Sequence, residues 1–461
     1  MVAEKTPKSR YGVSRRTFVE AAALGAAAWP LARAQVLDVT EAEPFTAEEA
    51  LSMARNRRGE LLELLSHLVS IRSQSGETAA SAQSVVKEYL AGLPYDVEDA
   101  ADRPSLFTEH AEFTPPDPPG DGPFVNVVGR PRAEPGSQLV LFAHIDSHLV
   151  EGGWNTDPYM AVTDSGRLYG LGTADDKGGV AAMLVAVAAL SDSGGPTPIV
   201  ISHHGKGGGS RGSLPVFERM KDSGEQVDAV LYVHPAETGR GLDNIKHVVR
   251  GALDVVLTVD GWQGEQLEIG LPDSALWADG GDALEVCWQA ITLLRDGVLR
   301  SSEVNVGRLE AGDRTGSVAD NARADIRILF DGAHTWRGLM ESMRSELDSF
   351  SAGLPQGRGR FDISIDPAGT HSNPGAVAWD DTWCQVLRHS IEDVTGRAPV
   401  SYPNHYGGDI RFPIRLLGKP AFGIGSLAGN FYGPNEWVDI DDLVRLVAIL
   451  ILTVSRWASI R

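Results

Sequence analysis

The chain has 461 residues, of which 42% are hydrophobic and 22% charged, a composition that is ordinary for a globular protein of two or three domains and that excludes wholesale disorder. Its 62 acidic and 41 basic residues give a formal net charge of −21, which argues against a broad nucleic-acid-binding surface. Only Cys287 and Cys384 are present, too few for a disulfide framework or a cysteine zinc cluster, and we expect two free buried thiols.

The N-terminal segment is similar to a twin-arginine export signal. Arg15 and Arg16 precede a run of small apolar residues over 21–31, and the run ends in Ala-Arg-Ala at 32–34, the small-residue pattern of a signal-peptidase site. We therefore expect residues 1–34 to be removed and the mature protein to be periplasmic or secreted.

The mature chain begins with apolar residues at helical spacing, which predict one long helix over 46–72. A segment rich in Pro, Asp and Gly, 103–122, predicts a loop. Strand and helix patterns then alternate, and this alternation predicts a mostly parallel sheet with helices on both faces, an α/β fold. The predicted strands are 124–129, 138–143, 198–202 and 229–233, and the predicted helices are 179–190 and 213–221.

The pattern changes near Arg250 to that of a separate α+β unit, with strands at 251–259 and 322–329 and a helix at 282–295. The first pattern then resumes, with a helix at 379–395, a strand at 420–424 and an apolar stretch at 443–457. Two arginines interrupt that last stretch, which is too short to span a bilayer, so we expect a buried helix. These patterns predict a discontinuous larger domain, 35–248 plus 366–461, interrupted by a smaller inserted domain, 249–365.

Polar residues directly follow one predicted strand. His144 and Asp146 come after the apolar run 139–143, so both should emerge at the C-terminal end of a parallel strand, where open α/β sheets place ligands. Further on, the turn Gly-Leu-Gly-Thr-Ala-Asp-Asp-Lys-Gly-Gly, 170–179, places Asp175 before the positive end of a helix. Alone, His-x-Asp is more often a structural pair and Asp175 an N-cap. Together the two motifs predict a functional site.

These motifs resemble those of the zinc-dependent aminoacylase and exopeptidase family that includes carboxypeptidase G, acetylornithine deacetylase, succinyl-diaminopimelate desuccinylase and carnosinase. The resemblance extends over nearly all of the mature chain, from 62–75 to Gly-Asp-Ile-Arg at 408–411 and Pro-Asn-Glu at 434–436. It implies a zinc exopeptidase-like α/β domain with an inserted α+β lid that forms a homodimer. It also implies two metal ions bridged by an aspartate, and a glutamate that activates water for attack on an amide carbonyl.

The resemblance assigns roles to four residues. His144 matches a terminal metal ligand, Asp146 the carboxylate that orients it, and Asp175 the bridging aspartate. A further ligand, acidic in the family, becomes His234, and imidazole is an equally competent zinc ligand. His144, Asp175 and His234 would therefore hold one zinc ion with room for water, the composition of an open catalytic site.

The positions that serve the second metal and the base are changed. The register puts Lys206 at the general base and Gly207 at a metal ligand, and Tyr432 replaces the last histidine ligand. We therefore hypothesise a one-metal site in which the Lys206 ammonium occupies the space of the missing cation and pairs with Asp175. There it could polarise a carbonyl or stabilise an oxyanion. Alternatively, Lys206 merely neutralises Asp175 in an inactive site.

An active enzyme would need another residue in place of the missing base, because general-base catalysis typically increases the rate by a factor of about 10² to 10⁴. Candidates are His204, Glu237 and His405, and we take His405 as the catalytic residue, because the resemblance places it near the site mouth and histidine titrates in a useful range. The lid also departs from the family pattern, with Trp262 and Gly316 in place of a histidine and an asparagine. Both changes put ordinary amino-acid substrates in doubt.

Three functions are compatible with these residues. The first is an exported, metal-dependent hydrolase of a peptide-like or N-acyl amide bond in a small molecule. The second is a catalytically silent relative that binds a ligand or serves as a partner subunit. In the third, Lys206 forms covalent adducts with carbonyl compounds, which predicts a borohydride-trappable intermediate. The first two differ in whether His144, Asp175 and His234 hold a metal that changes a reaction rate.

Overall fold

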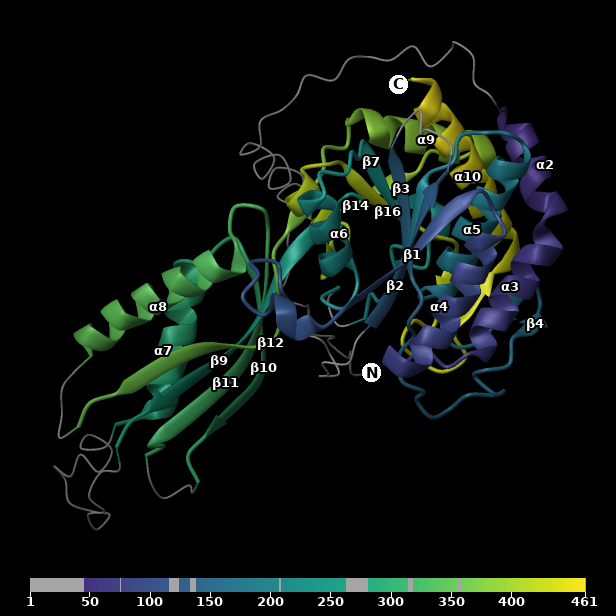
Figure 1. Cartoon of the computed structure of the whole chain (residues 1–461). Helices are drawn as coiled ribbons and strands as arrows, with labels where there is room; N and C mark the ends of the chain where they lie inside the picture. The colour runs from purple at the N-terminus through teal and green to yellow at the C-terminus, as the bar shows by residue number, and fades with distance from the viewer. Residues whose placement is uncertain are drawn as a thin grey trace, which may run out of the picture.

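The computed structural model of the chain describes residues 45–74, 76–115, 124–132, 138–206, 209–262, 281–313, 318–354 and 359–460. The expected export signal, 1–34, lies outside the described residues, as do Gly207 and Gly316. Figure 1 shows a larger part that contains both ends of the described chain and a smaller part that projects from it at the lower left.

The larger part is built on an eight-stranded sheet. Its strands in spatial order are β1 (Tyr95–Asp102), β2 (Phe124–Pro131), β6 (Ile199–His203), β3 (Leu139–His144), β7 (Ala229–Val233), β16 (Ala421–Ile424), β8 (Asn244–Lys246) and β14 (Val400–Tyr402). The four central strands, β6, β3, β7 and β16, run parallel. The pairs β1–β2, β2–β6 and β16–β8 are antiparallel, so the predicted parallel core is confirmed within a mixed sheet.

Helices cover both faces of this sheet, as the alternation of elements predicts (Figure 1). One face packs against α2 (Ala47–Asn56), α3 (Arg58–Ser70), α4 (Gly76–Ala91), α5 (Lys177–Asp192), α9 (Thr382–Thr395) and α10 (Ile440–Ser459). The other packs against α6 (Ser213–Asp222) and the short helix η4 (Pro413–Leu417). Successive residues of β3 alternate between the two cores, because side chains along a strand point to opposite faces.

Two expectations about buried residues are confirmed. The terminal helix α10 is buried along most of its length. Cys287 and Cys384 are both free and buried.

Among the described helices, none combines the length and the hydropathy of a membrane span.

The predicted single helix over 46–72 is wrong, because the segment forms two helices, α2 and α3, that meet at Arg57. The Arg57 backbone leaves the helical region (φ −101°, ψ 9°), and its guanidinium pairs with Glu60 and Asp192. Gly59, a weak helix former, follows in the first turn of α3. The apolar spacing continues across the break, so periodicity alone does not show it.

The smaller part is the lid. Its antiparallel sheet has the order β10 (Glu303–Ala311), β11 (Asn321–Phe330), β9 (Val248–Asp260) and β12 (Asp362–Ser372), and α7 (Ala283–Asp296) and α8 (Trp336–Gly353) pack against it. Strand β12 pairs with β9 as far as Ser372, so this sheet continues past residue 365, where the sequence pattern places the end of the lid. The start of β9 pairs with β13 (Gly375–Ala376) and β15 (His405–Tyr406).

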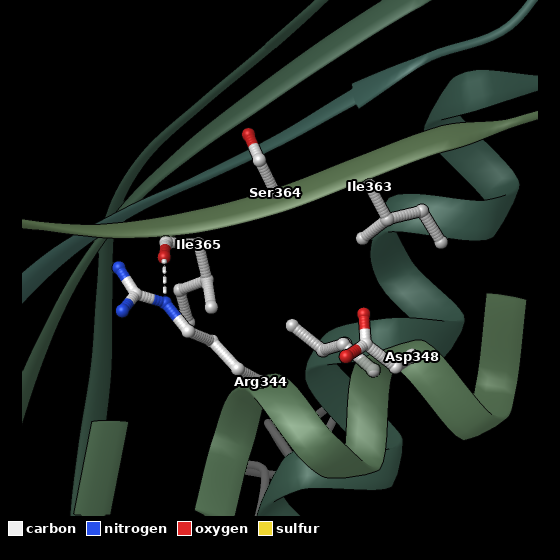
Figure 2. A pocket seen from close by; sticks show the side chains of 6 residues that line it. Arg344, Asp348, Ile363, Ser364 and Ile365 are labelled. Carbon is white, nitrogen blue, oxygen red and sulfur yellow. Dashed lines mark hydrogen bonds between the residues drawn. The ribbon is translucent and has the colours of Figure 1, made fainter. Parts of the chain in front are cut away.

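A small hollow lies between α8 and β12 of the lid (Figure 2). Its lining residues are Arg344, Leu347, Asp348, Ile363, Ser364 and Ile365. The Arg344 Nε donates to the Ile365 carbonyl at 3.2 Å, which ties the helix to the strand. Because the lining residues include no histidine or cysteine, the hollow is not a second candidate for metal chemistry.

A third, four-stranded sheet lies beside the larger one, with the order β17 (Ala428–Gly429), β18 (Trp437–Asp439), β5 (Arg167–Tyr169) and β4 (Val162–Asp164). The pairing of β18 with β5 brings the segment just before Asp175 against the segment that contains Tyr432 and Glu436. This sheet therefore brings the turn that contains Asp175 close to the segment that contains Tyr432 and Glu436, although the two are far apart in sequence. Two short 3-10 turns complete the described elements, η2 (Pro104–Phe107) and η3 (Gly241–Asp243).

Candidate metal centre

Three neighbouring parallel strands carry polar side chains to one edge of the large sheet. Strand β3 ends at His144, His234 directly follows β7, and Lys206 lies just beyond the end of β6. The C-terminal ends of adjacent parallel strands meet at the same edge, so these residues lie together as the sequence predicts.

Asp175 comes from the turn that precedes α5, and Glu436 holds this turn in place. The Glu436 carboxylate accepts hydrogen bonds from the backbone N–H groups of Gly172 (2.8 Å), Ala174 (2.8 Å) and Asp175 (3.0 Å). Glu436 is buried, with 3% of its surface exposed. The sequence analysis placed Glu436 in a family motif and assigned it no role, because its partners lie more than 250 residues away.

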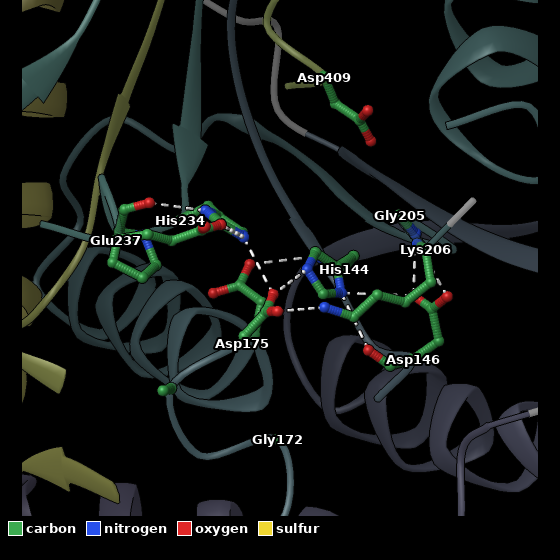
Figure 3. A network of polar contacts seen from close by, with 12 residues as sticks. His144, Asp146, Gly172, Asp175, Gly205, Lys206, His234, Glu237 and Asp409 are labelled. Atoms are coloured by element: carbon green, nitrogen blue, oxygen red, sulfur yellow. Dashed lines mark hydrogen bonds and ion pairs between the residues drawn. The ribbon is translucent and has the colours of Figure 1, made fainter. Parts of the chain in front are cut away.

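His144, His234 and Asp175 converge on one point (Figure 3). The Nε2 atoms of His144 and His234 lie 2.7 Å and 3.0 Å from the same atom, Asp175 Oδ1. Each Nδ1 lies beside a backbone carbonyl, that of Asp146 at 3.0 Å and that of Pro235 at 2.8 Å. A proton on each Nδ1 would bond to these carbonyls and leave both Nε2 atoms available as ligands.

This donor set fits one zinc ion. One ligand atom from each of His144, Asp175 and His234 lies within 4.8 Å of the others, and all three residues are buried. Two imidazoles and a carboxylate are the ligands of an open zinc site, in which the fourth position is left for water or substrate.

Two glycines allow the backbone to pass close to the metal ligands and their strands. A Cβ on Gly205 would lie 2.7 Å from His144 Cγ, and a Cβ on Gly179 would lie 2.0 Å from the Val233 carbonyl oxygen. Side chains at either position would displace the histidine ring or the helix that follows Asp175.

Beside Asp175, the described residues differ from the second-metal ligands that the family resemblance implies. The Lys206 ammonium contacts Asp175 Oδ2, which is the pairing that the sequence predicts, and lies 4.9 Å from the centre of the Tyr432 ring. The Tyr432 hydroxyl donates to Glu237 Oε1 at 2.9 Å. Tyr432 is 43% exposed as a whole, but desolvation of its hydroxyl and the nearby carboxylates raise its pKa well above the usual value, so it remains a neutral phenol and a poor zinc ligand.

Asp175 is ionised at the centre of these contacts. Burial alone would raise its pKa, but the charges of Lys206 and His144 and the hydrogen bonds from both histidines hold the pKa well below its usual value. Burial and Lys206 lower the pKa of His144, but Asp175 and Asp146 outweigh them and raise it to about 10. Metal binding at His144 therefore has to displace a proton, which makes the affinity depend on pH.

Lys246 of β8 is a residue of this site that the sequence analysis missed. It is 1% exposed, and its Nζ lies 2.6 Å from His234 Nδ1. Burial lowers the pKa of Lys246 to about 8, and burial together with Lys246 lowers the pKa of His234 to about 3. Since an ammonium only donates and the Pro235 carbonyl only accepts, these two neighbours favour opposite tautomers of His234.

The residues predicted to be catalytic lie at different distances from the ligands. Asp146 Oδ1 is 3.3 Å from His144 Nδ1, and the Asp146 carboxylate accepts from the backbone N–H groups of Gly205 (2.8 Å) and Lys206 (3.0 Å). Asp146 therefore orients the ligand and fixes the loop that carries Lys206. His405 is more distant, with its ring centre 6.4 Å from that of His234.

Known proteins are similar to this chain over most of its length. The profile of peptidase family M20/M25/M40 matches residues 140–456. The succinyl-diaminopimelate desuccinylase of Rhodospirillum centenum is 26% identical over 78% of this chain and 92% of that protein. The desuccinylase of Gluconacetobacter diazotrophicus is 28% identical over 80% of this chain and 89% of that protein.

Solved structures share the fold. The aminopeptidase PepT of Bacillus cereus superposes with a TM-score of 0.66 at 18% identity, covering 87% of this chain and 98% of that one. A dinuclear metal binding peptidase of the M20 family from Bacillus subtilis gives a TM-score of 0.62 at 13% identity, covering 88% and 99%. The family match covers more than half of the chain and includes His144, Asp175 and His234. The chain therefore belongs to peptidase family M20/M25/M40, whose members are metal-dependent hydrolases of amide bonds.

Proposed function

We propose that the protein is an exported hydrolase that cleaves a peptide-like or N-acyl amide bond in a small molecule and works with one metal ion. The observation that carries this proposal is the convergence of two histidine Nε2 atoms on Asp175 Oδ1 while Lys206 takes the other oxygen of the same carboxylate. The desuccinylase relatives and the peptidase structures support the class of bond.

The residues around the ligands have distinct tasks in this reaction. A zinc ion held by His144, His234 and Asp175 would polarise the amide carbonyl and lower the pKa of water. Asp146 fixes the orientation of the His144 ring through its contacts with Nδ1. Lys206 places a positive charge beside Asp175, in a site shielded from solvent, where it can stabilise the negative charge that develops on the carbonyl oxygen.

Metal content tests the proposal directly. We expect protein purified without chelator or affinity-tag histidines to hold one transition metal per chain, and a His144→Ala, His234→Ala double variant to hold none, because only one ligand would remain. Elemental analysis of both proteins gives the count. Two metals per chain would contradict the arrangement around Lys206 and Tyr432. A folded chain without metal would contradict the hydrolase and favour a binding or partner subunit.

The arginine pair Arg15 and Arg16 supports export by the twin-arginine route. In a bacterial host with this pathway, we expect an Arg15→Lys, Arg16→Lys variant to accumulate as full-length precursor in the cytoplasm, whereas Arg10→Lys, a matched change outside the pair, leaves export intact. Cell fractionation and immunoblotting measure the distribution. Export of the double variant at the wild-type level would exclude this route.

We also propose a homodimer formed through the lid. Helix α7 exposes Leu284 and Trp288, which are 41% and 47% accessible and would be covered by a partner. The mass of the purified protein in solution, measured on the same sample as its metal content, is then expected to be that of two chains.

A further inference from the structure

Three side chains fill the space beside Asp175 at which the family resemblance places the second metal. Lys206 contacts Asp175 Oδ2 and lies under the Tyr432 ring, and the Tyr432 hydroxyl in turn donates to Glu237 Oε1 at 2.9 Å. The replacements at this position are therefore joined to one another and to the remaining metal ligands. The last member of the series, Glu237, supplies a carboxylate.

Glu237 faces the ligands closely. Its Oε1 lies 4.0 Å from His234 Nε2 (Figure 3), and its side chain is 23% exposed, so Glu237 is partly accessible to solvent. Glu237 and Tyr432 both have left-handed backbones, with φ of +57° and +64°, which is strained for residues other than glycine. The surrounding structure therefore holds both backbones in a sparsely populated region, as it does those of Ser165, Asn430 and Asn435.

The other acidic side chains around the ligands are buried, and most of them are held by several donors. Asp176 is 0% exposed and therefore closed to solvent, and its Oδ2 accepts from the His144 backbone N–H at 3.3 Å. Asp146 accepts from two backbone N–H groups, and Glu436 accepts from three. Asp409 is buried and accepts from the Ser213 hydroxyl and lies 3.0 Å from His203 Nε2. Glu237 differs from these in being partly accessible to solvent and in having a single tyrosine hydroxyl as its hydrogen-bond donor among the described residues.

The histidine candidates for the base are less suitably placed than Glu237. The His204 ring is buried edge-on against Phe124, with centres 4.9 Å apart. The His405 ring centre lies 6.4 Å from that of His234, and no hydrogen bond joins it to the three ligands within the described residues. A proton acceptor has to reach the attacking water directly or through one water, and Glu237 satisfies this condition best.

We propose that Glu237 is the proton acceptor for the water that attacks the amide bond, and that Tyr432 is the residue that positions it. The oxygen of water bonds to the carbonyl carbon while one of its protons passes to the Glu237 carboxylate. The C–N bond then breaks, and the same proton goes to the leaving nitrogen, so the products are one carboxylic acid and one amine. This assignment rests on the proposed hydrolase function.

Turnover of zinc-loaded protein on N-succinyl amino acids and dipeptides tests the assignment. We expect Glu237→Gln to lower kcat by about 10²- to 10⁴-fold with KM and metal content unchanged, since it removes the base and keeps the size of the side chain. Glu237→Asp is expected to recover part of this loss, and Tyr432→Phe to displace the pH profile of kcat. Glu88→Gln, at an exposed position of α4, is the matched control. A Glu237→Gln variant with wild-type kcat would overturn the assignment.

Cobalt-loaded protein provides a measurement that needs no substrate. The visible spectrum of bound Co²⁺ changes with pH as groups around the ion lose protons, and we expect the midpoint of this change to move by about one pH unit or more in Glu237→Gln, equivalent to a tenfold shift. The midpoint of Glu88→Gln should stay at the wild-type value. One bound cobalt with an unmoved midpoint contradicts the role of Glu237 alone, whereas a chain that binds no cobalt contradicts the hydrolase itself.

Discussion

Replacing Glu436 with alanine is expected to lower the free energy of unfolding by about 3–6 kcal/mol and to weaken metal binding. The variant leaves the N–H groups of Gly172, Ala174 and Asp175 without their acceptor, and an unsatisfied buried group costs about 1–3 kcal/mol. Because a folded domain is stable by only about 5–15 kcal/mol, this loss is a large share of the total. Denaturant unfolding and metal titration measure the two effects.

A graded series separates the role of Glu436 from a general loss of packing. Glu436→Gln keeps one carbonyl oxygen, which can serve Ala174 and Asp175 because both bond to Oε1, so we expect about half of the alanine effect. Glu303→Ala, at a side chain that is 65% exposed, should change stability by less than about 0.5 kcal/mol. Wild-type stability and metal affinity in Glu436→Ala would mean that the turn holds Asp175 without this carboxylate.

The sequence suffices to predict the parts of the site that lie at strand ends. His144 and His234 directly follow short apolar runs, and Lys206 lies three residues past the end of a third strand, so the rule that parallel strands end at one edge brings them together. The contact of Lys206 with Asp175 is predicted from the family resemblance, whose register puts Lys206 at the base position beside the bridging aspartate.

Contacts between distant segments could not be predicted in this way. Lys246 reaches His234 because β8 pairs with β16, where a Cβ on Gly423 would lie 2.6 Å from Lys246 Cε. Glu237 and Tyr432 are 195 positions apart and meet through the turn that precedes β18. Periodicity and motif spacing report local order, whereas these pairs depend on how the sheets are joined in space.

Replacing Lys206 with methionine is expected to tighten binding of one divalent metal by about ten- to a hundredfold and to slow hydrolysis. The Lys206 ammonium contacts Asp175 Oδ2 and repels an incoming cation in a site of low dielectric, where like charges interact strongly. Methionine is similar in length and carries no charge, so it removes the repulsion with little change in packing. Loss of the positive charge also removes the stabilisation of a developing oxyanion.

Two further lysine variants make this result specific. Lys87→Met breaks an ion pair with Asp99 in which both side chains are more than 40% exposed, so it should leave metal affinity unchanged. Lys206→Glu places a carboxylate at the position of the family's base, yet we expect it still to bind one metal, because Gly207 has no side chain and the Tyr432 hydroxyl is bonded to Glu237.

Competition titrations with a chelator give the affinities, and elemental analysis gives the number of ions per chain. Unchanged affinity in Lys206→Met would show that the ammonium does not compete with the metal for Asp175, which would contradict the one-metal arrangement proposed above. If Lys206→Met binds the metal more tightly but keeps the wild-type turnover, Lys206 only neutralises the charge of Asp175. An ammonium that stabilises the transition state could not be removed without a loss of rate. A second ion in Lys206→Glu would mean that a residue other than Gly207 or Tyr432 completes its ligand set.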